Sequence, residues 1–160
     1  MVGAVLTVQD VWNCLESIKD PEVPALSIVE LKIARGVHVD GDKATVEISP
    51  TFVGCPALEL IAGSIHEKLL GMGFKTVDIN KSYTAQWSTD MLDETAREKL
   101  QTFGIAPPDL AGSVSIEVPT VCPYCKSTET QLENPFGATL CKQLYYCNSC
   151  RQSFEKFKTL

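Results

Sequence analysis

Long apolar runs are missing from this 160-residue sequence, and we expect no secretory leader at its start. No apolar stretch approaches the roughly 20 residues that a membrane-spanning helix needs. The first residues carry no basic group and soon meet the acidic Asp10, a pattern unlike that of a secretory signal. Internal repeats and low-complexity tracts are absent as well. We therefore expect a cytoplasmic protein with no membrane association.

Positive charge is also scarce, because 14 lysines and arginines stand against 20 aspartates and glutamates, for a net charge of −6. Nucleic-acid binding depends on clustered basic residues that neutralise phosphates, so it is disfavoured here. The two histidines, His38 and His66, lack metal-ligand spacing, and we expect His38 on the wet face of a strand. The glycine-rich phosphate loops and the H-E-x-x-H motif are absent. The sequence therefore predicts no catalytic centre of its own.

Cysteine, in contrast, is abundant and unevenly distributed. Five of the seven cysteines lie in the last 39 residues, while Cys14 and Cys55 stand alone upstream. In a reducing compartment, clustered cysteines indicate a metal site or catalysis more often than disulfides. The length allows one ordinary domain and a small module.

Hydrophobic periodicity predicts an α+β domain over residues 1–104, with a small mixed sheet covered by helices. Thr7 and Asp10 form a capping box before a helix that we expect to stop at Asp20-Pro21. The expected elements that follow are a hairpin around residues 40–42, a helix from Pro56 to Gly71 or Gly73, a strand at 77–79 and a helix at 90–103 with Phe103 on its apolar face.

The composition changes after this domain. Residues 105–113 lack periodicity and contain Pro107-Pro108, which predicts a linker. Residues 1–112 hold 9 basic and 16 acidic residues, a net charge of −7, whereas residues 113–160 hold 5 and 4, a net charge of +1. We expect a separate C-terminal module at residues 114–160.

Two C-x-x-C pairs, Cys122 with Cys125 and Cys147 with Cys150, stand 21 residues apart in this module. Each pair turns tightly enough for both sulfurs to reach one ion, so two pairs complete a tetrahedral site. The pattern is that of a zinc ribbon with structural Zn²⁺, and the alternative is a redox or iron site on the same thiols. A segment this short needs the metal to fold.

Two other features of the module have more than one interpretation. The tail, residues 151–158, interleaves basic and aromatic side chains. This pattern is typical of a weak surface on which nucleic-acid bases stack. The alternative is a partner-docking module in which the aromatic side chains pack on the sheet. Four thiolates around Zn²⁺ add negative charge, which favours docking. Cys141 is one cysteine more than a tetrahedral site needs. It packs as a small buried hydrophobic residue, or it is an auxiliary thiol beside the metal.

Cys55 precedes Pro56, a residue favoured at the first turn of a helix. The amides and dipole of a helix N-terminus stabilise a thiolate, so Cys55 is a candidate nucleophile, a soft-metal ligand or a plain cap. Cys14 lies beside the apolar stripe of the first helix, and packing is the simplest role for it.

Six motifs stand out along the chain: D-P-E-V-P at residues 20–24, S-I-V-E-L at 27–31, T-F-V-G-C-P at 51–56, W-S-T-D-M at 87–91, F-G-A-T-L-C-K at 136–142 and the two C-x-x-C pairs. Together they resemble the PaaD or PaaJ family, one of the components of the bacterial phenylacetyl-CoA epoxidase system, over nearly the whole chain. The N-terminal part is similar to SufT-like iron–sulfur assembly proteins. Lys32 departs from the family pattern, which usually has glycine there, and Ala138 stands where serine is common.

This resemblance implies an accessory role, in which the chain helps to deliver iron or an iron–sulfur cluster to the reductase or oxygenase components, which are other chains. It also implies a functional surface at Asp20, Glu22, Thr51 and Cys55. A transient cluster would need more ligands than one thiol, from these carboxylates or from a homodimer.

Three alternatives remain open from the sequence. In the first, the chain is a purely structural docking component of that system. In the second, it is a thiol enzyme with Cys55 as nucleophile and Asp20 or Glu22 as acid–base group. In the third, it is a zinc-ribbon nucleic-acid-binding protein. No motif places a histidine base beside Cys55, and the net charge disfavours the third alternative.

Overall fold

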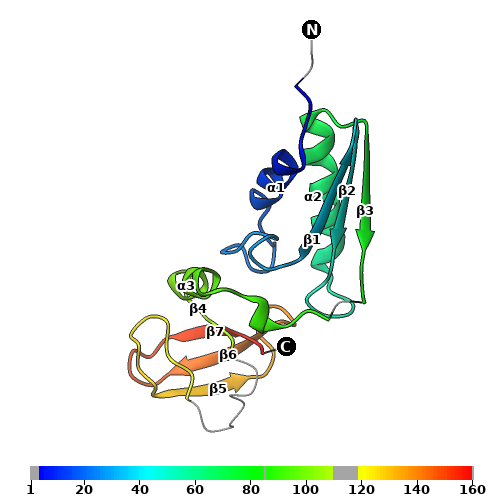
Figure 1. Ribbon diagram of the computed structural model, residues 1–160. Coiled ribbons are helices and arrows are strands. Elements are labelled where there is room, and N and C mark those ends of the chain that lie inside the picture. The colour runs from blue at the N-terminus through cyan, green and yellow to red at the C-terminus, as the bar shows by residue number, and fades with distance from the viewer. Residues whose placement is uncertain (1–3, 85, 110–118, 160) are drawn as a thin grey trace. The chain divides into compact units, whose positions relative to one another are not determined.

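The computed structural model describes residues 4–84, 86–109 and 119–159 (Figure 1). The chain divides into two compact units, Met1–Trp87 and Ser88–Leu160. Each unit has a small sheet accompanied by helices, as the α+β prediction requires. No described helix has both the length and the apolar character that crossing a bilayer would demand.

The first unit is built on a three-stranded mixed sheet in the order β1-β2-β3. The predicted hairpin is confirmed: β1 and β2 pair antiparallel around Gly41, whose φ of 59° is left-handed. β3 then pairs parallel with β2, because α2 returns the chain across the sheet. The elements are α1 (Val8–Glu16), β1 (Ala34–Asp40), β2 (Lys43–Ile48), α2 (Ala57–Met72) and β3 (Thr76–Lys81).

Local signals explain where these helices begin and end. The Thr7 hydroxyl accepts from the Asp10 amide at 3.2 Å, and the Asp10 carboxylate accepts from the Thr7 amide at 2.8 Å, so the predicted capping box is present. α1 ends at Glu16, earlier than predicted, because the Ser17 hydroxyl and amide both donate to the Cys14 carbonyl. α2 ends at left-handed Gly73. Fully buried side chains between helices and sheet form the core: Val11, Leu15, Ile28, Ile48, Ile61, Ile65 and Leu69.

The segment between α1 and β1 is held by side-chain hydrogen bonds. The Ser27 amide donates to the Glu30 carboxylate at 2.8 Å, and the Glu30 amide donates to the Ser27 hydroxyl at 3.1 Å. Buried Trp87 donates from Nε1 to the Leu31 carbonyl at 2.7 Å. Lys32 follows with a φ of 57°, in the left-handed region that disfavours any side chain with a Cβ. This strain explains why glycine suits the position that Lys32 occupies.

We expect Lys32→Gly to stabilise the first unit by about 0.5–1 kcal/mol. The left-handed conformation costs a non-glycine residue roughly 1–2 kcal/mol, and the greater freedom of glycine in the unfolded chain takes back about 0.5–1 kcal/mol. Urea unfolding followed by tryptophan fluorescence reports on this unit, since Trp12 and Trp87 are the only tryptophans. Lys32→Ala is the control: it keeps the strain and should give no gain, so an equal gain from both variants would contradict this explanation.

The second unit contains a four-stranded sheet in the order β4-β7-β6-β5. β5, β6 and β7 pair antiparallel, and β4 adds to β7 in parallel. The Asp93 carboxylate caps α3 by accepting from the Ala96 amide at 2.8 Å. The elements are a 3₁₀ turn η1 (Thr89–Met91), α3 (Glu94–Thr102), β4 (Ile105–Ala106), β5 (Thr130–Asn134), β6 (Lys142–Cys147) and β7 (Ser153–Phe157).

The division between the units lies earlier than the predicted domain end at residue 104. α3 and β4 belong to the second unit, and β4 occupies the first two residues of the predicted linker, 105–113. The Tyr124 ring packs so closely on Gly104 that a Cβ there would lie 3.1 Å from it. Residues 110–118 lie outside the described residues. Phe103 is 57% exposed, so its prediction as part of the apolar face of α3 is wrong.

Candidate functional site

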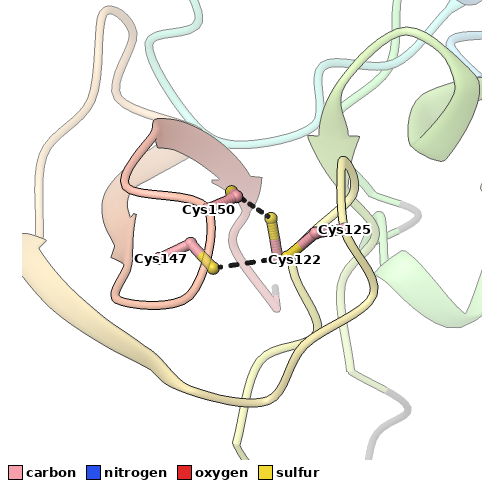
Figure 2. A group of neighbouring side chains, drawn as sticks. All are labelled: Cys122, Cys125, Cys147 and Cys150. Atoms are coloured by element: carbon pink, nitrogen blue, oxygen red, sulfur yellow. Dashed lines mark hydrogen bonds between the residues drawn. The ribbon is translucent and has the colours of Figure 1, made fainter.

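The four cysteines of the two C-x-x-C pairs converge in the second unit, as Figure 2 shows. Their sulfurs all lie within 4.8 Å of one another. Cys122 Sγ is 3.8 Å from Cys150 Sγ, and Cys125 Sγ is 3.6 Å from Cys147 Sγ. No other described group of three or more histidine, cysteine, aspartate or glutamate side chains gathers in this way.

The two turns that carry these thiols have the same backbone structure. The Lys126 amide donates to the Cys122 carbonyl at 3.0 Å, and the Arg151 amide donates to the Cys147 carbonyl at 2.9 Å. Lys126 and Arg151 both adopt a left-handed φ, 64° and 60°. The first cysteine of each turn also donates its amide to a carbonyl five residues later, Ser127 or Gln152. Such turns point both sulfurs of a pair to the same side.

The arrangement fits a tetrahedral Zn²⁺ site. Zn–S bonds of about 2.3 Å in a tetrahedron place the sulfurs about 3.8 Å apart, close to the two distances here. The backbone N–H groups of Cys150 and Ser149 and the neighbouring thiols lower the pKa of Cys147 to about 7, with the Cys150 amide as the largest cause. The backbone amides of this turn thus favour the Cys147 thiolate, the form that binds a metal ion. The donor set, four thiolates, is that of a structural zinc site.

The metal site forms the centre of a small core. Cys122 and Cys147 are fully buried with Ala106 and Phe154, and Tyr145 stacks on Phe154 with ring centroids 5.7 Å apart. An apolar core this small cannot hold the sheet together alone, so the bonds to the metal supply much of its stability.

The tail after the second cysteine pair folds back as β7. Phe154 and Phe157 are 3% and 1% exposed, and Lys156 is buried with its ammonium 2.7 Å from the Asp109 carboxylate. These aromatic rings pack inside the module, as one of the two predictions for the tail stated. They offer no stacking surface for bases, which disfavours nucleic-acid binding further.

Cys141 lies outside the four-sulfur cluster. Its side chain is buried, and its sulfur is 3.1 Å from the Thr139 hydroxyl. The burial agrees with packing as a small hydrophobe, and a role as an auxiliary thiol stays a prediction.

A tight turn presents Cys55 in the first unit. The Cys55 amide donates to the Phe52 carbonyl at 3.2 Å, and Gly54 has a φ of 83°, the geometry of a type II turn. Pro56 then caps α2, so Cys55 stands at the helix N-terminus as predicted. The thiol is half-buried and receives hydrogen bonds from the Ala57 amide and the Thr51 side chain.

Two carboxylates from the segment that follows α1 act on this thiol through their charge. The pKa of Cys55 responds to the charges of both Glu22 and Asp20 and to a hydrogen bond from Thr51, while a functional surface made by these four residues stays a prediction. Asp20 is 4% exposed, and its Oδ1 accepts from the Glu22 amide at 2.7 Å and the Val23 amide at 3.0 Å. These bonds shape the D-P-E-V loop and fix the buried carboxylate.

The helix N-terminus favours the Cys55 thiolate as predicted, but other causes decide the direction in which the pKa of this thiol moves. Burial raises the pKa of this thiol above its ordinary value, and the charges of Glu22 and Asp20 raise it further. The Ala57 amide and the Thr51 hydroxyl lower the pKa, but the opposing causes outweigh them. Together these causes favour the protonated thiol over the thiolate.

We expect iodoacetamide to alkylate Cys55 more slowly than an unperturbed thiol at pH 8. Only the thiolate reacts, and the raised pKa leaves a smaller fraction of Cys55 in the thiolate form at this pH. Glu22→Gln removes a negative charge, lowers the pKa and should speed the reaction about threefold at low salt. Peptide-level mass spectrometry after timed iodoacetamide treatment measures this rate. The exposed Glu67→Gln is the matched control on α2; equal rates in all three proteins would refute the electrostatic explanation.

The remaining candidates lie apart from this chemistry. Cys14 is half-buried, and burial raises the pKa of its thiol, as expected for a packing role. His38 and His66 are both exposed, His38 on the predicted wet face of β1. The Ala57 amide is the free amide of the helix start that the sequence predicted beside the thiol, because Pro56 marks where α2 begins.

Known proteins resemble both units. A family model described as PaaD zinc beta ribbon domain matches residues 108–158, and one described as iron–sulfur cluster assembly protein matches residues 8–80. A protein of Escherichia coli (strain K12), provisionally named as the D component of 1,2-phenylacetyl-CoA epoxidase, is 39% identical over 154 residues, which is 96% of this chain and 93% of that protein. An Fe-S protein maturation auxiliary factor of Porphyromonas gingivalis is 30% identical over 96 residues, 59% of this chain and 90% of that protein.

Two solved structures share the fold of the N-terminal part. A domain of unknown function from Bacillus anthracis has a TM-score of 0.53 and 24% identity, covering 58% of this chain and 90% of that one. A conserved hypothetical protein from Thermotoga maritima has the same TM-score and 23% identity, covering 62% and 98%. Together, the near full-length match, the zinc ribbon and the assembly-protein domain show that the chain belongs to the PaaD family of phenylacetyl-CoA epoxidase components.

Proposed function

We propose that this chain is a maturation subunit of a phenylacetyl-CoA ring-epoxidising oxygenase system, in which Cys55 transiently binds iron or an iron–sulfur cluster on its way to the reductase or oxygenase component. Two relatives support this role by name: an epoxidase component and an Fe-S protein maturation auxiliary factor. The observation that carries it is the half-buried Cys55 thiol, whose pKa is raised in part by the charges of Glu22 and Asp20.

This constellation suits a cation. The two carboxylates oppose a thiolate, but they attract a metal ion that approaches the sulfur. When iron binds, the Cys55 thiol releases its proton to solvent and an S–Fe bond forms. The iron cation then takes the place of the proton on the sulfur, so its positive charge lies near the two carboxylates. The raised pKa weakens the bound state, because the ion competes with the proton. Weak holding is what a carrier needs if it is to release its cargo.

The same features oppose a thiol enzyme. A catalytic cysteine needs a lowered pKa or an adjacent base, and burial raises the pKa of Cys55. Both histidines are exposed, and neither contributes to the pKa of Cys55.

Ligand number limits what Cys55 holds alone. Clusters are normally held by several thiolates, so the cargo needs further ligands from Glu22, from Asp20 or from Cys55 of a second copy. Asp20 already accepts two backbone amides, whereas Glu22 lies at partial exposure and suits an incoming ion better. Glu22 is therefore the first candidate for a further ligand, and Cys55 of a second copy is the alternative.

The experiment that tests the proposed function is anaerobic delivery of iron and sulfide from this chain to the apo-reductase. Wild type should support delivery and Cys55→Ala should not. Cys14→Ala, which removes a thiol from the same unit, should behave as wild type.

A further inference from the structure

The loop between β5 and β6, residues 135–141, is a structured element that the proposed function does not use. It carries most of the F-G-A-T-L-C-K motif at residues 136–142. We call residues 135–141 the ribbon loop. It belongs to the second unit and lies outside the four-sulfur cluster.

Specific bonds brace the ribbon loop. The Gly137 amide donates to the Lys142 carbonyl at 2.7 Å, and the Ala138 amide donates to Glu155 Oε1 at 3.0 Å. The other oxygen of Glu155 accepts from the ammonium of Lys142 at 2.9 Å, and Lys142 is only 6% exposed. A buried ion pair thus ties the loop to β6 and β7. Such bracing preorganises whatever the loop presents.

Gly137 lets the loop approach this brace. A Cβ at residue 137 would stand 3.2 Å from Glu155 Oε1 and 3.2 Å from the Lys142 carbonyl. Any other residue would therefore press on the ion pair and on the backbone of β6. The glycine of the motif is explained by this close approach.

The braced loop holds two large apolar side chains in solvent. Phe136 is 60% exposed and Leu140 is 58% exposed, whereas Phe154 and Phe157 of the same unit are buried. The ammonium of Lys158 lies 4.5 Å from the centroid of the Phe136 ring, and Lys158 has no ion-pair partner among the described residues. The loop therefore offers an aromatic ring, an aliphatic side chain and a positive charge.

We propose that the ribbon loop docks the chain onto another protein of the same oxygenase system, through an apolar pocket that takes Phe136 and Leu140 and a carboxylate that pairs with Lys158. The proposal rests on the proposed function for the identity of that partner. Preorganised aromatic anchors of this kind commonly contribute most of the energy of an interface.

The size and charge of the loop favour a transient contact with a different protein over a second copy of this chain. The two apolar side chains expose on the order of 200 Å², a fraction of the roughly 800 Å² that each partner buries in a stable interface. Obligate homodimers bury still more. The chain also carries a net charge of −6, which opposes close contact between copies. A brief encounter suits a protein that delivers cargo and leaves.

The test measures binding of the full-length, zinc-loaded chain to the separately purified reductase and oxygenase components by calorimetry. Phe136→Ser should weaken binding to one of them at least tenfold, and Leu140→Ser several-fold. Lys158→Glu should weaken it too, by an amount that shrinks at high salt. Leu70→Ser, which changes an exposed leucine at the far end of α2, should bind as wild type. One zinc per chain in each variant shows that the module is folded.

Three results would overturn this docking role. The first is that all loop variants bind with wild-type affinity, and the second is that the wild type binds neither component. The third is that the wild type self-associates and that Phe136→Ser abolishes this self-association without changing binding to the components. The site at Cys55 is tested separately, because docking variants should regain normal delivery at saturating reductase whereas Cys55→Ala should fail at any concentration. Loss of one behaviour without the other identifies which proposal fails.

Discussion

Cys122→Ser should cost the chain its zinc and unfold the sheet of the second unit while the first unit stays folded. Structural zinc contributes on the order of 10–16 kcal/mol to small modules, as much as or more than the whole stability of a typical domain. Cys122 is also fully buried in the small core with Cys147 and Phe154. A serine hydroxyl there would leave three thiols around an incomplete site.

Elemental analysis and two-dimensional NMR measure this outcome. Wild type should contain about one zinc per chain, and Cys122→Ser close to none, with the dispersed amide signals of β5, β6 and β7 lost. β4 should be lost with them, because it pairs only with β7 among the described strands. Tryptophan fluorescence, which reports on the first unit, should stay native, and Cys14→Ser is the matched cysteine control. Iron and sulfide at this site, or a folded metal-free sheet, would contradict the zinc assignment.

Cys55→Ala should abolish maturation of the oxygenase system in cells. We expect at least a tenfold loss of epoxidase activity in a strain that carries this variant as its only copy. The reason is chemical: alanine keeps the turn and the cap of α2 but removes the sulfur on which the charges of Asp20 and Glu22 act. Protein stability should change little, since the thiol is only half-buried.

Growth on phenylacetate and the iron content of the purified reductase are the measurements. Cys14→Ala in the same strain controls for loss of a thiol from the first unit. Full activity with Cys55→Ala, at equal protein levels, would leave a structural docking role as the better interpretation. Partial loss with Glu22→Gln is expected if the carboxylate assists the cargo.

The metal site was predictable because its information is local. Each C-x-x-C turn closes within six residues, and the left-handed Lys126 and Arg151 need no help from distant segments. The hairpin and the capping box at Thr7 are local for the same reason. Spacing in the sequence is then enough to name the ligands and the geometry.

The Cys55 environment was only half predictable. Pro56 indicated the helix start, but the pKa depends on burial and on Glu22 and Asp20, which are more than 30 residues away and come near only in the folded chain. The helix amides act on the sulfur as expected, and longer-range causes outweigh them. Only the resemblance to a known family grouped these residues in advance of the structure.

The boundary between the units shows a different limit. β4 has two residues, too few for an alternating pattern, and its partner strand begins almost 50 residues later. Residues 105–106 therefore look like a linker in the sequence although they complete a sheet. Phe103 matched the helical period, but α3 ends just before it and leaves the ring in solvent.

The most direct test of the central claim is delivery of iron and sulfide to the apo-reductase from the zinc-loaded chain, reconstituted under anaerobic conditions. Optical spectra of the separated proteins follow the cargo before and after mixing. The account predicts that wild type loses its iron–sulfur absorption as the reductase gains it, and that Cys55→Ala neither acquires nor transfers the cargo. Equal transfer from wild type and Cys55→Ala would contradict it.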